Sequence, residues 1–375
     1  MISIATDNQI PEIEKYLLQY FSQKRFNLRH LPSEELIPQN LQDMDAVFVR
    51  STLEVDEIFC SMPNLKFVGS ATAGMNHLHL DSLHRHNIHW AHAPGCNSSS
   101  VTHYVMAVIA ELIKQGLFNV RQTVGIIGYG NIGKKLYALL NDLNIPCLVH
   151  DPLLQEDHLA PLSEVLSCDL ISIHAPATAA GPYPTLGLIN ATHKELLKNK
   201  ILINSSRGGL VDEALPLELD SLIYVADVWL DEPKPNLQLI ERAFIATPHI
   251  AGYSIEGKLN GSQIMASKCA EFFEQKSICQ DIGLNLAPYP EDGRELIRDM
   301  HGFGFPINLF HRELDLIAIS TQLKALTQES LAEGFKRMRV NHPSRHDFSV
   351  FDYSRLENID EDMDLDFLSN LRNFN

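Results

Sequence analysis

The sequence predicts an α/β protein with two doubly wound parallel-sheet domains and a smaller C-terminal domain. A chain of 375 residues is long for one hydrophobic core, so we expect two or three domains. Short apolar strands alternate with helical stretches through residues 1–95, and this βαβ rhythm is typical of a parallel sheet. A second series of strands follows a helix that begins near residue 97. A connector rich in proline and glycine at 284–293 then precedes the last region.

Each expected strand is a short apolar run. A helix is expected at EIEKYLLQYF (12–21), and a second at SSSVTHYVMAVIAELIKQ (98–115), where serines can cap the helix start. The later strands end at Asp, His, Ser or Pro, and ligands of a doubly wound sheet bind at the carboxyl ends of its strands. We therefore expect the chemistry there. The expected strands are ISIAT (2–6), AVFVRS (46–51), KFVGSAT (66–72), TVGII (123–127), CLVHDP (147–152), LISIHAP (170–176), ILINSS (201–206), LIYVADVW (222–229) and FIATPH (244–249).

Composition limits the kind of protein. The formal net charge of −17 argues against non-specific binding to nucleic acid or to anionic membranes. The start, MISIATDNQIP, lacks the pattern of a signal peptide, and the longest apolar stretch, at 105–113, is too short to span a bilayer. We therefore expect a cytoplasmic protein. The six cysteines form no CxxC pair and are expected as reduced thiols, and the histidines of 77–92 fit no ligand spacing, so no metal is predicted.

A glycine-rich turn, GYGNIG at 128–133, predicts a dinucleotide site. It lies between the strand TVGII and an amphipathic helix at 134–143, which is the context in which this motif is informative. Gly128 would permit the tight turn, Gly130 would let the backbone approach a pyrophosphate, and Gly133 would let helix and strand pack closely. The N–H groups at the start of the helix would then bind the phosphates.

Asp151 is expected to select the cofactor. It ends the next strand, and 151 − 133 = 18 residues separate it from the last glycine, close to the spacing of a ribose-binding acid. Its carboxylate would accept hydrogen bonds from the ribose hydroxyls and repel a 2′-phosphate, which favours NAD over NADP. The alternative is a turn residue before Pro152.

Three residues follow successive strands of the second series: Arg207 in INSSRGG, Glu232 in DVWLDEP and His249 in TPHIAGY. A guanidinium can hold a carboxylate in bidentate fashion. A histidine can move a proton near neutral pH, and a carboxylate beside it can tune that proton. Alone, each is compatible with an ion pair or a structural role. Together, on the same side of the sheet as the glycine turn, they suit oxidation of a 2-hydroxy acid by a nicotinamide cofactor.

The residues of these motifs resemble those of the D-isomer-specific 2-hydroxyacid dehydrogenases. The motifs are GYGNIG, HDP, HAP, NSSRGGLVDEAL, ADVWLDEP and TPHIAGY, and the resemblance covers roughly residues 45–260. Within that family, further segments are similar to a member that oxidises a phosphorylated 2-hydroxy acid and also has a C-terminal extension. These segments are VRSTLEV, KFVGSATAGMNHLHL, APGCNSSSV, AGPYPT and IAGYSIEGK.

The resemblance implies a role for each matching residue. Arg207 would bind the substrate carboxylate and polarise the C2 oxygen. His249 would remove the C2 hydroxyl proton as hydride leaves for NAD, and Glu232 would orient its ring and favour its protonated form. Substrate contacts are implied for Ser51, Thr72 and Tyr253. Cofactor contacts are implied for Gly128, Gly130, Asn131, Ile132, Gly133, Asp151, Ala175 (through its backbone), Ser205, Ser206, Arg207, Asp227 and Gly252.

The resemblance also implies three domains. Residues 1–95 with 256–285 would form a substrate-binding (lid) domain, 96–255 a Rossmann-like NAD-binding domain, and 286–375 an α+β dimerisation domain with an acidic tail, which predicts a homodimer. The last region has one basic cluster, FKRMRVNHPSRH at 335–346, for which a solvated helix face is favoured over a phosphate site.

The sequence leaves two alternatives open. One is another dehydrogenase of the family, acting on 3-phosphoglycerate or glyoxylate. The other is a non-catalytic NAD-sensing protein of the co-repressor type built on the same fold. The presence of Arg207, Glu232 and His249 argues against the second.

Overall fold

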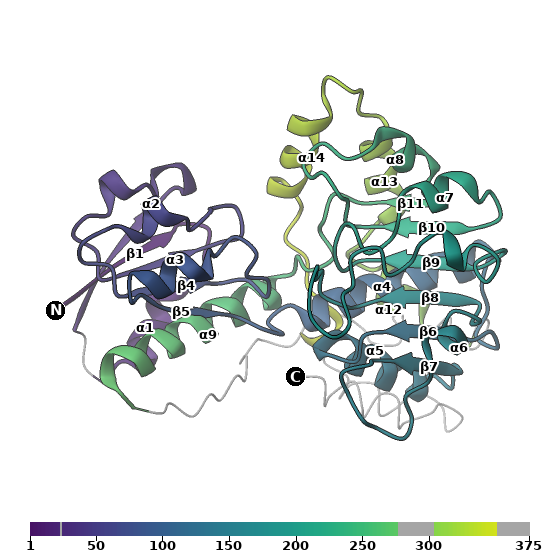
Figure 1. Ribbon diagram of the computed structural model, residues 1–375, viewed down its shortest axis with the longest axis horizontal. Helices are drawn as coiled ribbons and strands as arrows, with labels where there is room; N and C mark the ends of the chain where they lie inside the picture. Colours follow the sequence, from purple (N-terminus) through teal and green to yellow (C-terminus); the bar gives the residue numbers. More distant parts are fainter. Residues whose placement is uncertain (23–24, 277–303, 351–375) are drawn as a thin grey trace. The chain divides into compact units, whose positions relative to one another are not determined.

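The chain forms two compact units, each with its own sheet and hydrophobic core (Figure 1). The computed structural model describes residues 1–22, 25–276 and 304–350. Of these, residues 1–97 with 254–276 form the first unit, and residues 98–253 with 304–350 form the second. The predicted connector at 284–293 and the acidic tail at 357–367 lie outside the described residues.

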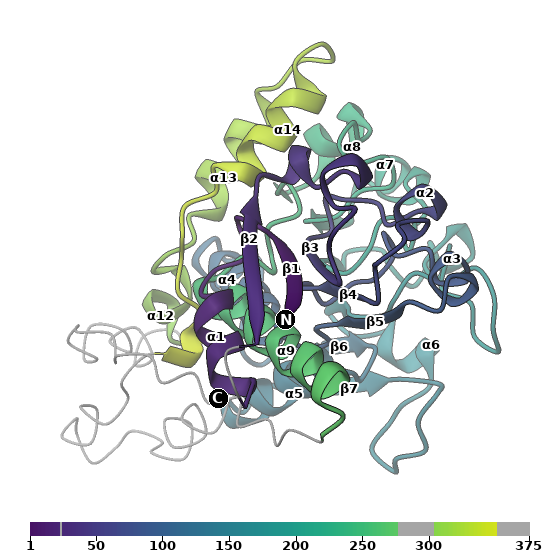
Figure 2. The ribbon, with the colours of Figure 1, turned by 90° about the vertical axis from the view of Figure 1, so that its left-hand side faces the viewer.

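The first unit is built on a five-stranded parallel sheet in the order β2-β1-β3-β4-β5 (Figure 2). The strand order reverses at β1, so the ligand crevice of this sheet is expected outside the carboxyl ends of β1 and β3. The two strands β3 and β4 are buried along their whole length. The strands are β1 (Ile2–Asp7), β2 (Phe26–Leu31), β3 (Ala46–Val49), β4 (Phe67–Ser70) and β5 (His89–His92).

Helices cover both faces of this sheet because successive strand residues point to opposite sides. Phe48 of β3 packs in the core that holds α1 and α9, whereas Val47 and Val49 pack in the core of α2 and α3. α9 begins at a capped turn, in which the Ser254 hydroxyl accepts from the Gly257 N–H at 2.9 Å. The helices are α1 (Ile13–Tyr20), α2 (Glu57–Cys60), α3 (Leu80–Arg85) and α9 (Ile255–Glu274), with 3-10 turns η1 (Ser33–Glu35) and η2 (Pro38–Asn40).

The second unit is built on a six-stranded parallel sheet in the order β11-β10-β9-β8-β6-β7. β6 pairs with β7 on one side and β8 on the other, so the order of connection reverses at β6. This is the topological switch point at which doubly wound sheets bind ligands. The strands are β6 (Val124–Ile127), β7 (Cys147–His150), β8 (Leu170–Ile173), β9 (Ile201–Asn204), β10 (Ile223–Ala226) and β11 (Ile245–Ala246).

One face of this sheet is covered by α4 and α5, and the other by α6, α7 and α8. α4 is apolar around most of its circumference and is almost completely buried, which is typical of a helix inside a core. The helices are α4 (Ser98–Lys114), α5 (Asn131–Asp142), α6 (Leu162–Val165), α7 (Ala214–Glu218) and α8 (Leu237–Arg242), with the 3-10 turn η3 (Ala191–His193).

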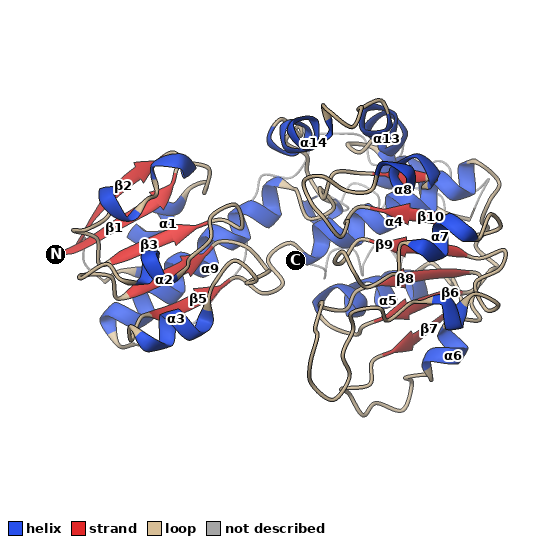
Figure 3. Cartoon of the chain, turned by 45° about the horizontal axis from the view of Figure 1, so that its top comes forward, coloured by secondary structure: helices blue, strands red, loops and turns tan. Residues whose placement is uncertain are grey.

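The C-terminal segment, residues 304–350, packs onto the second unit. α12 lies against α4, and α13 lies against β11, α8 and α14. Figure 3 shows α13 close to α8 and α14. Its apolar residues join both cores of the unit, Phe310 on one side and Phe335 on the other. The described part of the predicted α+β domain is helical, and the rest of 286–375 lies outside the described residues. The elements are α12 (Ile307–His311), α13 (Leu316–Lys324), α14 (Leu331–Val340) and the 3-10 turn η4 (Phe348–Val350).

The predicted fold class is confirmed, and every predicted strand is present. The structure adds β2 and β5, which the sequence did not indicate because most of their side chains are exposed or partly exposed. The five described cysteines are free thiols, and Cys279 lies outside the described residues. Within the described ranges, no helix combines the length and the apolar character needed to cross a membrane.

Candidate active site

The glycine turn follows β6 and has the geometry that its sequence predicts. Gly128 has a φ of 98°, and a Cβ at this position would lie 2.5 Å from the carbonyl oxygen of His174. A Cβ on Gly133 would lie 2.0 Å from the Gly128 carbonyl oxygen, so only glycine lets α5 start this close to the turn. Gly130, in contrast, faces open space, with no atom within 4 Å of where a Cβ would be.

The start of α5 suits a pyrophosphate. Asn131 and Ile132 form the first turn, and Gly130 precedes them without a side chain to cap the helix. The first N–H groups of an uncapped helix carry partial positive charge and bind anions. Nearby, two buried polar atoms, His174 Nδ1 and Ser205 Oγ, lack a hydrogen-bond partner among the described residues. The open glycine, the uncapped helix and these polar atoms fit a dinucleotide.

Asp151 follows β7 at the expected place beside the turn. One carboxylate oxygen accepts from the Tyr129 N–H at 2.9 Å, and the other accepts from the Leu153 N–H at 3.0 Å. A carboxylate oxygen can accept two hydrogen bonds, so both oxygens keep capacity for a ribose hydroxyl. The two backbone bonds fix the direction of the carboxylate. Asp151 therefore combines the turn-residue role with the geometry of a ribose-binding acid.

The loops after β8 and β9 are joined by side-chain hydrogen bonds. The Ser206 hydroxyl donates to the Ala175 carbonyl at 2.5 Å. Asn204 holds the second loop by donating to the Arg207 carbonyl at 2.9 Å and accepting from the Ser206 N–H at 3.2 Å. Both loops lie at the carboxyl edge of the sheet, so the predicted cofactor residues Ala175, Ser205 and Ser206 are brought to one place.

Close backbone contact brings the Arg207 loop to the Glu232 loop. A Cβ on Gly208 would lie 2.0 Å from the Trp229 carbonyl oxygen, a distance that only glycine permits. Arg207 is half-buried, and its Nη1 donates to the Ser206 carbonyl at 2.7 Å. Burial lowers the pKa of Arg207, and the charge of Glu232 opposes that effect. A guanidinium has five N–H donors, so this one retains donors for a substrate carboxylate.

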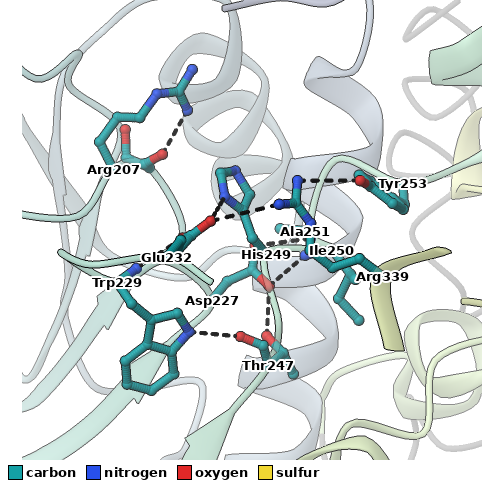
Figure 4. A network of polar contacts seen from close by, with 11 residues as sticks. Arg207, Asp227, Trp229, Glu232, Thr247, His249, Ile250, Ala251, Tyr253 and Arg339 are labelled. Carbon is teal, nitrogen blue, oxygen red and sulfur yellow. Dashed lines mark hydrogen bonds and ion pairs between the residues drawn. The ribbon is translucent and has the colours of Figure 1, made fainter. Parts of the chain in front are cut away.

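Glu232 and His249 form a hydrogen-bonded pair (Figure 4). His249 Nδ1 lies 2.7 Å from Glu232 Oε2, and Glu232 Oε1 accepts from the Trp229 N–H at 3.0 Å. Burial would raise the pKa of Glu232, but the hydrogen bond and charge of His249, the Trp229 N–H and the Arg339 guanidinium together lower it. An ionised carboxylate can only accept, so Nδ1 carries a proton. In the neutral ring, Nε2 is then the basic nitrogen.

The loop that carries His249 is fixed by Asp227. His249 has a φ of 57°, the left-handed conformation, and its N–H donates to the Asp227 carbonyl at 2.7 Å. The buried Asp227 carboxylate accepts from the Ile250 N–H at 2.8 Å, the Ala251 N–H at 2.9 Å and the Thr247 hydroxyl at 2.6 Å. These bonds hold a backbone conformation that a histidine rarely adopts. The structure thus assigns Asp227 a clamping role, and its contact with the nicotinamide stays a prediction.

The C-terminal segment supplies two arginines to the same loop. Arg345 is fully buried, and its Nη2 donates to the Ala251 carbonyl at 2.9 Å and the Ser100 carbonyl at 3.3 Å. Arg339 Nη2 donates to the Tyr253 hydroxyl at 3.2 Å. The interpretation of 335–346 as a solvated helix face is therefore wrong for these two arginines, because each bonds to the loop that follows His249. The spacing of a basic cluster does not show which side chains packing will cover.

The remaining predicted substrate residues, Ser51 and Thr72, belong to the first unit. Both follow central strands at the carboxyl edge of that sheet, Ser51 after β3 and Thr72 after β4. Ser51 is exposed. The Thr72 hydroxyl is 2.8 Å from Ser70 Oγ and donates to the Gly74 carbonyl at 3.1 Å, and Ser70 Oγ also lies 2.8 Å from His77 Nε2. Their roles, like those of Tyr253 and Gly252, remain predictions.

Comparison with a protein-family model identifies the class. The model of the D-isomer specific 2-hydroxyacid dehydrogenase NAD binding domain matches residues 112–251, which span the end of α4, the glycine turn, the Arg207 and Glu232 loops and His249. The solved structures agree on the fold. NAD⁺-bound 3-phosphoglycerate dehydrogenase of Entamoeba histolytica superimposes with a TM-score of 0.64 at 20% identity, covering 76% of this chain and 99% of that one. NAD-dependent formate dehydrogenase of Staphylococcus aureus gives 0.59 at 23% identity, covering 76% and 99%.

Curated relatives narrow the class further. Erythronate-4-phosphate dehydrogenase of Hahella chejuensis is 41% identical over 273 residues, which cover 70% of this chain and 70% of the relative. The enzyme of the same name from Shewanella halifaxensis is 32% identical over 361 residues, covering 93% and 94%. The chain belongs to the erythronate-4-phosphate dehydrogenases, within the D-isomer-specific 2-hydroxyacid dehydrogenase family, and it carries that family's NAD-binding domain.

Proposed function

We propose that the protein oxidises 4-phospho-D-erythronate to (R)-3-hydroxy-2-oxo-4-phosphooxybutanoate with NAD, in the biosynthesis of pyridoxine 5′-phosphate. Bound NAD supplies the hydride acceptor. The reaction breaks the C2–H and O–H bonds of the alcohol, and yields the ketone, NADH and one proton. The observation that carries the proposal is the 2.7 Å Glu232–His249 hydrogen bond beside the Arg207 loop, in a chain whose relatives bear this enzyme's name.

His249, Glu232 and Arg207 each have a separate role in the proposed reaction, and their contacts support these roles. The lone pair on His249 Nε2 takes the C2 hydroxyl proton, because Nδ1 is committed to Glu232. Glu232 keeps the ring oriented and stabilises the imidazolium that results. Arg207 binds the substrate carboxylate through two parallel N–H donors and polarises the C2 oxygen. The carboxylate and C2 oxygen are thus held while the proton and the hydride depart.

The other assignments belong to the same proposal. Residues 1–95 with 256–285 act as the substrate-binding lid domain, 96–255 as the NAD-binding domain and 286–375 as the dimerisation domain of a cytoplasmic homodimer. Ser51, Thr72 and Tyr253 contact the substrate. Asp151 binds the ribose, and its charge gives NAD preference over NADP. The net charge of −17 supports the assignment of a small-molecule partner rather than nucleic acid.

A substrate comparison tests the proposed reaction. NADH formation would be followed with purified protein, NAD and either 4-phosphoerythronate, 3-phosphoglycerate or glycolate, the last being the reduced partner of glyoxylate. We expect 4-phosphoerythronate to have the highest kcat/KM, by a factor of at least about 100, since removing a matched polar group from a substrate costs several kcal/mol. A higher kcat/KM for either rival would overturn the substrate assignment. NAD binding without turnover of any of the three would instead support the sensor alternative.

A further inference from the structure

One guanidinium from the C-terminal segment contacts both the acid–base pair and the predicted substrate residue beside it. Arg339 Nη1 lies 3.8 Å from Glu232 Oε2, the oxygen that also bonds His249. Its Nη2 donates to the Tyr253 hydroxyl at 3.2 Å, and its guanidinium carbon lies 5.8 Å from the centre of the Tyr253 ring. Figure 4 shows Arg339 between Glu232 and Tyr253.

Packing of α14 holds this arginine in place. Leu331, Gly334 and Phe335 form the buried face of the helix, and Gly334 approaches the Leu326 side chain so closely that an added Cβ would lie 2.6 Å from it. Arg339 follows Phe335 by four residues, about one helical turn, so it lies on the same side. Only 22% of its side chain is exposed, whereas Arg337 on the same helix is exposed.

We propose that Arg339 is a positioning residue for the reaction, which the C-terminal segment supplies to the Glu232–His249 pair of its own chain, and that its fixed charge weakens the hold of the pair on a proton. The effect of Arg339 on the pair does not depend on the proposed function, but its role in the reaction does. Oxidation needs neutral His249 as the base. A lone carboxylate would stabilise the protonated ring strongly, and a cation beside the same carboxylate oxygen offsets part of that stabilisation.

The surroundings leave Arg339 as the cation best placed for this effect. Among the described residues, the charged and titratable groups that contact the pair or lie beside its two loops include Arg207, Glu213, Asp227, Asp231, Tyr253, Arg339 and His342. The Asp227 carboxylate is engaged by the loop N–H groups, and Glu213 accepts from the Leu230 N–H at 3.3 Å. In the proposed function, Arg207 binds the substrate carboxylate. Arg339 can therefore act on the Glu232 carboxylate while Arg207 remains available to the substrate.

The hydrogen bond to Tyr253 gives Arg339 a second effect. Tyr253 accepts from the guanidinium, so the position of its ring depends on the same side chain that tunes the pair. In the proposed function, Tyr253 touches the substrate. Replacing Arg339 should therefore raise KM as well as change the pH dependence of kcat/KM.

Two measurements on the full-length protein test the inference. The first is the profile of kcat/KM between about pH 5 and pH 10, in which the acid limb reports the catalytic base. In Arg339→Met this limb should move upward by about 0.5–1 pH unit, the size expected for one partly exposed charge a few ångströms away. The second needs no turnover: the imidazole resonance of His249, assigned by its loss in His249→Asn, is titrated by NMR, and its midpoint should move by the same amount.

Matched variants separate charge from structure. Arg339→Lys keeps the charge, so its limb and midpoint should stay closer to wild type than those of Arg339→Met, and Arg337→Met on the exposed face should change neither. Equal shifts in the Lys and Met variants, or an unchanged His249 midpoint in folded Arg339→Met, would overturn the inference. If the midpoint moves but wild type does not oxidise 4-phosphoerythronate, the proposed function fails and the inference stands. If the wild type oxidises 4-phosphoerythronate but the His249 midpoint does not move in Arg339→Met, the proposed function stands and the inference fails.

Discussion

Replacing Glu232 with glutamine is the most direct test of the acid–base pair. The carboxylate accepts from two donors, His249 Nδ1 at 2.7 Å and the Trp229 N–H at 3.0 Å. Glutamine has the same shape but only one oxygen. If that oxygen meets the Trp229 N–H, the amide NH₂ faces Nδ1 and forces the proton onto Nε2, where the ring can no longer accept from the substrate. If it meets His249, the NH₂ opposes the Trp229 N–H.

The size of the effect follows from the geometry. The carboxylate and the imidazolium formed during the reaction have their charge centres about 5 Å apart, which gives about 3 kcal/mol at an effective dielectric constant of about 20. Side-chain exposures of 19% for Glu232 and 31% for His249 imply some solvent screening. We therefore expect a loss of about 2–3 kcal/mol of transition-state stabilisation, or about 30–150-fold in kcat/KM.

The assay is the initial rate of NADH formation, with NAD affinity measured separately to show that the cofactor site is intact. Glu213→Gln is the matched control. Glu213 accepts from the Leu230 N–H in the same loop at 3.3 Å, so it carries a similar bond without being hydrogen-bonded to His249. We expect the control to keep its activity within about twofold, as is usual for changes away from the reacting groups. A Glu232→Gln enzyme with near wild-type kcat/KM would refute the role of the pair.

Three further predictions follow from other contacts. Arg207→Lys keeps the charge but loses the two parallel donors, so kcat/KM should fall by about 10–100-fold with unchanged NAD affinity; near-normal kinetics would contradict the clamp role. Gly208→Ala would place a Cβ 2.0 Å from the Trp229 carbonyl oxygen, so the Arg207 and Glu232 loops must separate. We expect both Tm and kcat to fall. An unchanged Tm would disprove the close approach of the two loops. Burial lowers the pKa of His174 to about 3, so the unfolded chain takes up this proton below about pH 6.5 while the folded chain does not. Between pH 7.5 and pH 5, the free energy of unfolding of the wild type, measured by urea unfolding, should fall by about 2 kcal/mol more than that of His174→Gln. If the two free energies differ by the same amount at both pH values, the folded protein does not keep His174 neutral.

Local sequence was sufficient for the second sheet, for the three central strands of the first sheet and for much of the site. The strands of the second unit are buried apolar runs that end in polar residues, and parallel topology brings those ends together whatever the helices do. This is why the order of Arg207, Glu232 and His249 along the chain was enough to group them in one site. The Glu232–His249 hydrogen bond is the contact that the implied orienting role of Glu232 requires. It forms because β10 and β11 are paired, which places the two loops side by side.

Residues whose role depends on long-range packing could not be predicted. Arg337 and Arg339 are two residues apart in one basic cluster, yet only the second reaches Glu232, since the choice is made by which face of α14 packs. The family resemblance implied a cofactor contact for Asp227. That contact stays a prediction. The structure adds that its carboxylate accepts three bonds from residues 20 to 24 positions ahead, and no local pattern indicates such a clamp.

Ala251 links the His249 loop to the C-terminal segment. Its N–H is held by Asp227, and its carbonyl by Arg345, almost a hundred residues later. A truncation that removes the C-terminal segment would leave the Ala251 backbone with the Asp227 bond but without the Arg345 bond. It would also expose the two cores that Phe310 and Phe335 join. Exchange of this segment between homologues should therefore be designed together with residues 247–253, as one transferable piece.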